Sequence, residues 1–297
     1  MKLRQLIAIP TLWRYMVPLL LCMAPAALAN APDGAAATNV ASRIAALAPS
    51  LTELVYAAGA GDKLVAVSAF SDYPNAARTL PQVADYSGIN IEALLSLKPD
   101  LVLVWGSGTQ EKQIQRLAAL GIRTERIGIE TLADISVALR RIGELAGTRP
   151  LAERAAQSAT ERTRSLAAQF QARSVVSVFV EVGRSPLLSV NDRHFISELV
   201  RLCGGKNIFA DATTLVFQPS REQLLIKQPD VILFGESRTS NPGQTRNNDV
   251  YTGLDASRRG DLLGINADHL LRPGPRLLDA ADEVCRKMDA VRTRRWR

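Results

Sequence analysis

Aromatic and charged side chains that follow predicted strands are the residues of this sequence best suited to chemistry. Phe70 follows a strand predicted over 63–68, and Trp105 ends one predicted over 101–105. Ligands of α/β proteins collect at the carboxyl ends of the strands. The sequence therefore predicts a small-molecule site with flat apolar walls and a few polar groups. Its candidate residues are Phe70, Tyr86, Trp105, Phe217, Asp268, His269, Leu270, Leu271 and Arg272.

These candidates have structural alternatives. Each ring, taken alone, could equally belong to a hydrophobic core. Trp105 is the strongest of them, because it ends a strand and runs into Gly106-Ser107-Gly108. Asp268 and Arg272 could pair with each other or with Arg276 instead of meeting a ligand.

Catalytic motifs are scarce in this chain. It contains no G-x-S-x-G, no H-E-x-x-H and no G-x-x-x-x-G-K, and its two histidines are His194 and His269. A triad or a zinc site would need more partners than these. A hydrolase that uses Asp268 or Asp72 as a base stays an alternative, but no nucleophile stands beside either residue. We predict a binding protein that is not an enzyme and has no catalytic cofactor or metal.

The charge of the chain lies at its two ends. The formal charge of +7 comes from 36 basic and 29 acidic residues among 297. Residues 1–29 carry three cations and no acid, and four arginines lie within 292–297. A nucleic-acid-binding protein would gather its excess charge on a folded face. We therefore predict no nucleic-acid partner and interpret 292–297 as a solvated basic tail.

Residues 1–29 have the pattern of a secretory signal peptide. A positive region precedes the apolar run 16–27, and Ala27-Leu28-Ala29 is a small-x-small cleavage site. Three leucines precede Cys22, whereas a lipoprotein signal favours a small residue there, so lipidation is not expected. The protein is predicted to be exported to the periplasm. There, Cys203 and Cys285 form an even pair for which a disulfide is the default. A metal or redox pair lacks CxxC spacing and histidine neighbours.

Alternating strand and helix patterns predict an α/β fold with two Rossmann-like lobes around central sheets. The ranges are a loose leader (30–42), an N-terminal lobe (43–147), a bridging helix (148–173) and a C-terminal lobe (174–291). Residues 148–173 lack an internal glycine, and their middle is polar and alanine-rich. Such a helix has no core to bury into at its middle, which suits a single long rigid bridge between lobes.

An internal repeat relates the two lobes. Glu92 stands seven residues before Pro99-Asp100, and Glu222 stands seven residues before Pro229-Asp230. Each Pro-Asp pair opens a buried strand. Convergent helix-turn-strand sequence is one explanation. The other is that the two glutamates occupy matching places, which a partner with two-fold symmetry could meet with one kind of patch.

Several segments together resemble the helical-backbone (class III) family of periplasmic cobalamin (vitamin B12) binding proteins of ABC importers. The segments are ALAPSLTELVYAAGAG (46–61), SAFSDYP (68–74), YSGINIEALLSLKPDLVLVW (86–105), LAALGI (117–122), LVRLCGGKNIF (199–209), SREQLL (220–225) and RPGPR (272–276). They cover nearly all of 43–290 in order. The resemblance implies two α/β lobes joined by one helix, a ligand held between them, and little closure on binding.

The resemblance also assigns roles to residues. Phe70 and Tyr86 take the places of a ligand-contacting tyrosine and a tryptophan, Trp105 is retained, and 268–272 matches a segment at the corrin's amide edge. Glu92 and Glu222 match glutamates that dock on the permease subunits of the importer, and Cys203 and Cys285 match a family disulfide.

The chain departs from the family pattern at several places. His269 replaces an aromatic residue, Leu271 replaces an acid, and Val182 stands where an aromatic residue is expected. The ring near Phe217 has moved by one place. The ligand could therefore be a related corrinoid, or heme with His269 or Tyr86 as the iron ligand.

The sequence thus predicts the exported, monomeric substrate-binding component of an ABC importer that carries cobalamin between two lobes. A heme or ferric-siderophore carrier on the same fold is the alternative.

Overall fold

The computed structural model of this protein describes residues 40–106, 108–237 and 249–295, all within the unit Asn39–Arg297. The predicted signal peptide, Cys22 and most of the leader 30–42 lie outside the described residues. Ala41, at the end of that leader, is not loose. It is buried, and its N–H donates to the carbonyl of Leu145 at 2.8 Å.

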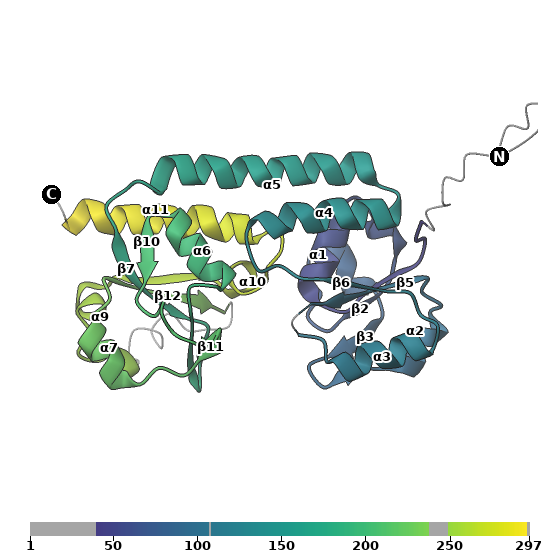
Figure 1. Ribbon diagram of the computed structural model, residues 1–297, viewed down its shortest axis with the longest axis horizontal. Helices are drawn as coiled ribbons and strands as arrows, with labels where there is room; N and C mark the ends of the chain where they lie inside the picture. Colours follow the sequence, from purple (N-terminus) through teal and green to yellow (C-terminus); the bar gives the residue numbers. More distant parts are fainter. Residues whose placement is uncertain (1–39, 107, 238–248, 296–297) are drawn as a thin grey trace, which may run out of the picture. The chain divides into compact units, whose positions relative to one another are not determined.

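The N-terminal lobe is built on a six-stranded sheet in the order β4-β3-β2-β1-β5-β6 (Figure 1). Its strands are parallel except for the antiparallel β3–β4 pair. Their bounds are β1 (Ile44–Ala46), β2 (Leu64–Ser68), β3 (Gln82–Asp85), β4 (Gly88–Ile89), β5 (Leu101–Trp105) and β6 (Thr124–Ile127). The helices of this lobe are α1 (Pro49–Ala57), α2 (Ile91–Ser96), α3 (Glu111–Ala119) and α4 (Ala133–Ala146), with short 3-10 turns at Gly61–Lys63 and Asn75–Thr79.

The C-terminal lobe has a four-stranded parallel sheet in the order β10-β7-β12-β13. These strands are β7 (Val176–Glu181), β10 (Gly205–Asn207), β12 (Val231–Glu236) and β13 (Leu262–Asn266). A small antiparallel sheet adds β8 (Gly183–Arg184), β9 (Leu187–Val190) and β11 (Val216–Phe217). The helices are α6 (Phe195–Leu202), α7 (Arg221–Lys227), α9 (Asp255–Arg259), α10 (Ala267–Leu270) and α11 (Leu277–Arg295), with a 3-10 turn at Asp249–Tyr251. The α/β fold with two lobes is confirmed.

One long helix, α5 (Arg149–Phe170), connects the lobes, but it does not lack a core to pack on. Figure 1 shows it running above α4 and α11, and it contacts both. Its alanines Ala152, Ala156 and Ala159 are buried. Gly143 of α4 lets the helices approach, because a Cβ built there would lie 2.2 Å from the Cβ of Ala152. The alanine-rich middle is therefore a close-packing face, and the prediction that it has no core to bury into is wrong.

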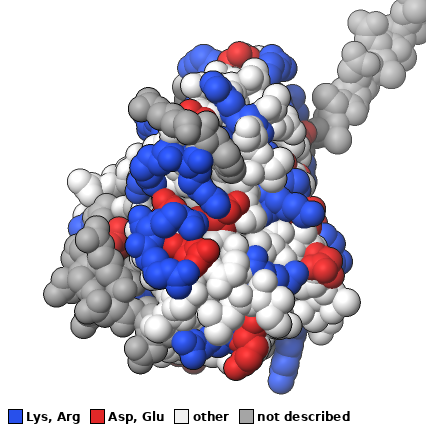
Figure 2. Space-filling view, turned by 90° about the vertical axis from the view of Figure 1, so that its left-hand side faces the viewer, with Lys and Arg blue, Asp and Glu red and all other residues white. Residues whose placement is uncertain are grey.

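The prediction of a solvated basic tail at 292–297 is also wrong for those of its residues that the structure describes. Helix α11 continues to Arg295, because its cations have partners there. Arg292 is buried, and Arg294 pairs with Asp261 at 2.8 Å. Arg295 pairs with Asp230. Figure 2 views this end of the C-terminal lobe and shows basic side chains interleaved with acidic ones. The local charge is thus matched by acids that are distant in the sequence.

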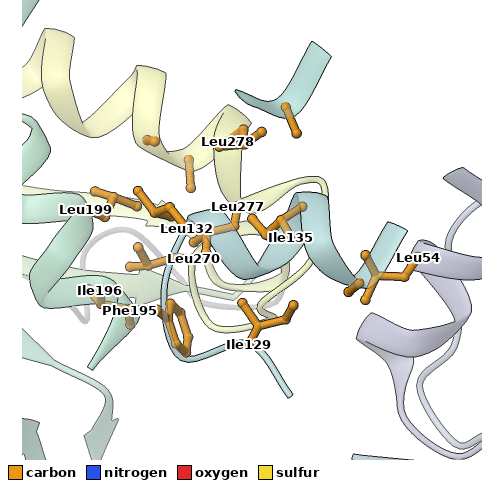
Figure 3. Packing of buried hydrophobic residues seen from close by; sticks show 14 of the residues in the cluster. Leu54, Ile129, Leu132, Ile135, Phe195, Ile196, Leu199, Leu270, Leu277 and Leu278 are labelled. Atoms are coloured by element: carbon orange, nitrogen blue, oxygen red, sulfur yellow. The ribbon is translucent and has the colours of Figure 1, made fainter. Parts of the chain in front are cut away.

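A single hydrophobic cluster continues from one lobe into the other. It contains residues of α1, of the segment that leads into α4, of helix α6 and of the start of α11 (Figure 3). The residues that meet there include Leu54, Ile129, Leu132, Ile135, Phe195, Ile196, Leu199, Leu270, Leu277 and Leu278. Close-packed cores deform little. The shared cluster therefore fixes the two lobes against each other in addition to the covalent connection through α5.

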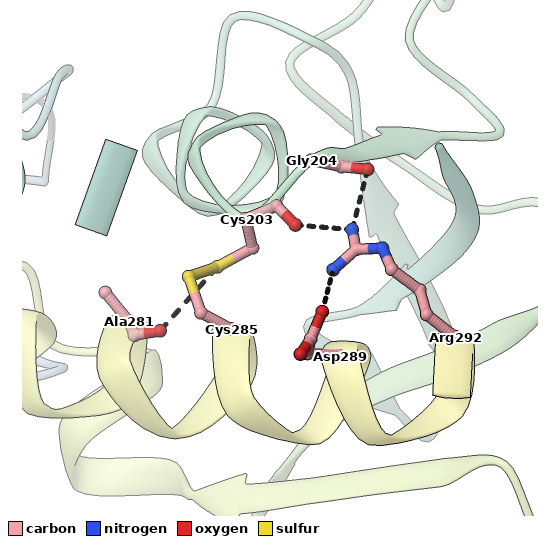
Figure 4. Close-up of a disulfide and its surroundings, with 6 residues drawn as sticks. All are labelled: Cys203, Gly204, Ala281, Cys285, Asp289 and Arg292. Carbon is pink, nitrogen blue, oxygen red and sulfur yellow. Dashed lines mark hydrogen bonds and ion pairs between the residues drawn. A yellow bond between two sulfur atoms is a disulfide. The ribbon is translucent and has the colours of Figure 1, made fainter. Parts of the chain in front are cut away.

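Cys203 and Cys285 form the predicted disulfide (Figure 4). The bond ties the end of α6 to the middle of α11, across 82 residues of chain. Beside it, Arg292 donates to the carbonyls of Cys203 and Gly204 at 2.6 and 2.9 Å. A covalent bond and a buried cation therefore hold α11 on the C-terminal lobe at the same place.

We expect the Cys203→Ser variant to lose about 2–4 kcal/mol of unfolding free energy, because the closed loop is long. Its melting temperature should fall by roughly 5–15 °C. Calorimetry with and without a reductant provides the control: reductant should lower the melting temperature of the wild type and leave that of the variant unchanged. Equal sensitivity of both proteins to reductant would refute a stabilising role for this bond.

Candidate functional site

A cavity of about 520 Å³ lies between the two lobes and is called here the cleft cavity. The N-terminal lobe contributes Trp105, Ile129 and Glu130 to its lining. The C-terminal lobe contributes Val182, Arg193, His194, Phe195, Ile196, Leu215, Leu271 and Pro273. Apolar walls with a few polar groups are the usual form of a small-molecule site. The cleft is therefore the candidate binding site.

Trp105 borders this cavity and a second one. Trp105 is the last residue of β5, and its backbone N–H donates a hydrogen bond to Oγ1 of Thr109 at 3.1 Å. Gly108 leaves room for the indole, since a Cβ built there would lie 2.9 Å from Cδ1 of Trp105. The second cavity, of about 300 Å³, is called the rim cavity and is lined by Phe70 and Tyr86 as well as Trp105. The structure thus brings the three predicted rings together in the lining of the rim cavity.

Phe70 and Tyr86 are presented outward by tight turns. Phe70 has a φ of 63°, which a bulky residue rarely adopts, and its side chain is 69% exposed. Tyr86 is 97% exposed at the tip of the β3–β4 hairpin. Oδ1 of Asp85 accepts hydrogen bonds from the N–H and hydroxyl of Ser87 and closes that turn. Exposed aromatic rings on constrained turns are available to cover a flat ligand.

Arg272 and Asp268 pair with each other at 2.7 Å, the alternative that the sequence left open. Arg272 also donates to Asp72 of the N-terminal lobe at 2.8 Å. Burial alone would raise the pKa of Asp72, but the hydrogen bond and charge of Arg272 hold it below its ordinary value. Leu270 lies between Asp268 and Arg272 in the sequence. Its side chain is wholly buried in the core, so the prediction that it contacts a ligand is wrong.

A second, deeper ion pair crosses between the lobes beside the first. Arg276, which precedes α11, donates to both carboxylate oxygens of Glu53 on α1, at 2.9 and 2.5 Å. Both side chains are buried, and Arg276 also lies over the ring of Tyr73 at 4.3 Å. Burial raises the pKa of Glu53, an effect that the hydrogen bond from Arg276 opposes. Glu53, Asp72, Asp268, Arg272 and Arg276 form what we call the interlobe joint.

Two more predicted site residues are absent from the lining of both cavities, as are Asp268, Leu270 and Arg272. Phe217 packs its edge on Phe209, with ring centroids 5.3 Å apart, and belongs to the core of its own lobe. It is not among the residues that line the cleft cavity or the rim cavity. His269, on α10, is half-buried and lines neither of these two cavities. Leu271 does line the cleft cavity, as does Val182.

Sequence reasoning missed the wall that Arg193, His194 and Phe195 contribute from the C-terminal lobe. These residues follow β9 and begin α6. Their position after a strand was the available signal, but β9 was not predicted. Burial lowers the pKa of His194 to about 4.

The internal repeat has the same local geometry in both lobes. Glu92 and Glu222 are exposed in the first turns of α2 and α7, which lie on the side of this unit opposite α5 in Figure 1. Asp100 accepts hydrogen bonds from the N–H and hydroxyl of Ser42, and Asp230 accepts the same pair from Ser177. The sequence repeat therefore corresponds to a repeated local structure, in which each glutamate and each aspartate has the same place in its lobe.

No helix in the described part of the chain is long and apolar enough to cross a bilayer. Residues 44–268 match the family described as periplasmic binding protein. A curated relative from Vibrio cholerae, named vitamin B12-binding protein, is 38% identical over 82% of this chain and 88% of its own length.

Solved structures give the same picture. The crystal structure of the periplasmic vitamin B12 binding protein BtuF of Vibrio cholerae matches with a TM-score of 0.77 and 36% identity, over 85% of this chain and 98% of that chain. The periplasmic heme binding protein HutB of Vibrio cholerae matches with a TM-score of 0.71 and 20% identity, over 83% and 98% of the two chains. The second likeness concerns the fold alone.

Proposed function

This chain belongs to the periplasmic binding protein family, and from that premise we propose that it is the exported substrate-binding component of an ABC importer and that its ligand is cobalamin. The observation that carries the proposal is the 38% identity to a protein named vitamin B12-binding protein, which extends over most of both chains. The two cavities that share Trp105 support it, because they offer aromatic rings to a broad flat ligand.

In this proposal, a corrinoid lies in the cleft and is released chemically unchanged. Trp105, Phe70 and Tyr86 pack on its apolar faces. Aromatic contacts contribute about 0.5–1.5 kcal/mol each beyond the burial of their area. The shared core and the interlobe joint hold the lobes in place before the ligand arrives. A preorganised site loses less free energy to ordering when it binds.

Calorimetric titration of the purified protein with cyanocobalamin tests the proposal. We expect saturable heat with one ligand per chain. A parallel titration with hemin distinguishes the alternative carrier of the same fold. If cyanocobalamin gives no binding heat and bound hemin gives a Soret band, cobalamin is refuted as the ligand and heme takes its place in the proposal.

We further propose that Glu92 and Glu222 dock on the two membrane subunits of the importer. Both carboxylates are exposed at matching places on the two lobes, and no described residue forms an ion pair with either. Two related patches suit a partner with two-fold symmetry.

The double variant Glu92→Arg/Glu222→Arg should therefore bind cyanocobalamin like the wild type and lower cobalamin uptake in cells by tenfold or more. The two introduced arginines would repel a basic surface on the partner, because their charges have the same sign. Glu161→Arg is the control, because Glu161 is exposed on α5 and the charge at that single site is reversed in the same way. Normal uptake by the double variant, or weaker binding of cyanocobalamin, would refute a docking role.

A further inference from the structure

His194 stands at the start of α6, in the wall that the C-terminal lobe contributes to the cleft cavity. Its side chain caps this helix, because Nδ1 accepts a hydrogen bond from the N–H of Ile196 at 3.2 Å. The ring also lies against Phe195, with centroids 4.2 Å apart and planes inclined by 32°. Two independent contacts therefore fix the orientation of the imidazole.

The capping bond determines which nitrogen carries the proton. A neutral imidazole has one nitrogen that donates and one that accepts. Since Nδ1 accepts, the proton is on Nε2. The ring stays neutral near pH 7, because burial lowers its pKa to about 4 and because the positive end of a helix dipole disfavours a cation. His194 therefore has one remaining polar group, the Nε2–H donor.

Within the described ranges of the chain, the Nε2–H donor has no hydrogen-bond partner. No described residue accepts a hydrogen bond from Nε2, and His194 is only partly buried where it lines the cleft cavity. The lining of this cavity is mostly apolar, and Arg193 and Glu130 are its charged members among the described residues. A ligand that displaces water from Nε2 must supply an acceptor, since an unpaired buried donor lowers affinity by a factor of about 5 or more.

We infer that His194 is a specificity-determining residue whose Nε2–H donates a hydrogen bond to an amide carbonyl oxygen of the bound corrinoid. This inference rests on the proposed function and deepens it. In this tautomer, His194 does not serve as an axial ligand to the metal of the guest. The lone pair of Nδ1 is engaged by the helix, and Nε2 has none while it holds its proton.

Two substitutions separate the two nitrogens. In His194→Asn, Oδ1 takes the place of Nδ1 as the cap, since asparagine is a favourable N-cap residue, and the distal donor is lost. In His194→Gln, the side-chain amide reaches as far as Nε2 and restores the donor, but the cap is lost. Each variant thus removes one role and keeps the other.

We expect cyanocobalamin to bind about tenfold more weakly to His194→Asn, with an unchanged melting temperature. His194→Gln should bind within about threefold of the wild type and melt roughly 2–4 °C lower. Weak binding by the glutamine variant together with full affinity of the asparagine variant would overturn the inference.

Two spectroscopic measurements complete the test. The nitrogen chemical shifts of ¹⁵N-histidine-labelled protein, assigned with His194→Asn, should show the Nε2–H form, and the Nδ1–H form or a cation at pH 7 would overturn the inference. Bound aquocobalamin should keep its free visible spectrum in the wild type. A spectral shift that disappears in His194→Asn would show coordination and overturn it.

Failure of the proposed function gives a different result. If the wild type does not bind cyanocobalamin, the proposed ligand is refuted, and the amide acceptor named here is refuted with it. If the wild type binds and His194→Asn binds equally well, only the role of His194 is refuted.

Discussion

Replacing Glu53 with glutamine should lower the free energy of unfolding by about 3–5 kcal/mol. The side chains of Glu53 and Arg276 are only 2% and 7% exposed, and they meet in a two-point hydrogen bond between the lobes. Glutamine leaves the guanidinium charge of Arg276 buried without its carboxylate. An uncompensated buried charge is among the most destabilising changes in a folded protein. Urea unfolding followed by circular dichroism measures the loss.

Two further proteins make this prediction specific. Arg162→Ala breaks the exposed pair with Asp279, whose side chains are 43% and 49% exposed, and should cost only about 0–1 kcal/mol. The double variant Glu53→Leu/Arg276→Met removes both charges and should regain most of the stability that the single variant loses. If Glu53→Gln proves no less stable than Arg162→Ala, the buried ion pair does not have the stabilising role that we assign to it.

The interlobe joint also explains why RPGPR (272–276) carries two arginines. Arg272 reaches Asp72, and Arg276 reaches Glu53, so one short segment of the C-terminal lobe binds two acids of the N-terminal lobe. Gly274 sits between them, where a Cβ would meet the backbone oxygen of Ser50 at 3.6 Å. This segment positions the lobes, and Asp268 is part of the same network.

Replacing Trp105 with alanine should weaken cyanocobalamin binding by about 3–4 kcal/mol, a factor of 100 or more. Among the residues that the structure describes, its indole is the one side chain shared by the cleft cavity and the rim cavity. Tryptophans at the centre of a contact region commonly dominate its binding energy. Calorimetric titration gives the dissociation constants of the wild type and the variant.

Tyr86→Ala is the matched comparison, because that ring lies at the rim and is 97% exposed in the unbound protein. We expect it to weaken binding by less than about 1 kcal/mol. Trp105→Phe should retain part of the lost affinity, since a ring remains. Equal losses for Trp105→Ala and Tyr86→Ala would mean that Trp105 is not the centre of the site.

Local patterns in the sequence were enough to determine the elements and their class. Strand β5 has the predicted bounds 101–105, and β2 begins one residue later than the predicted strand 63–68, because apolar runs and the residues that end them act over a few neighbouring positions. The repeat of Glu92 and Glu222 was also visible, since it is a matter of spacing. The pairing of Cys203 with Cys285 followed from their being the two cysteines beyond the predicted signal peptide.

Tertiary structure decided what each of those residues meets. The short strand β11 exists because β9, more than twenty residues earlier in the chain, completes its hydrogen bonds. The same distance in sequence hid the burial of Leu270 and of Arg292. Burial and charge pairing depend on surfaces brought together from distant segments, and no local pattern encodes them. The sequence by itself determined the two lobes and their rings, whereas only the folded chain determined that Arg272 and Arg276 join the lobes and that His194 lines the cleft.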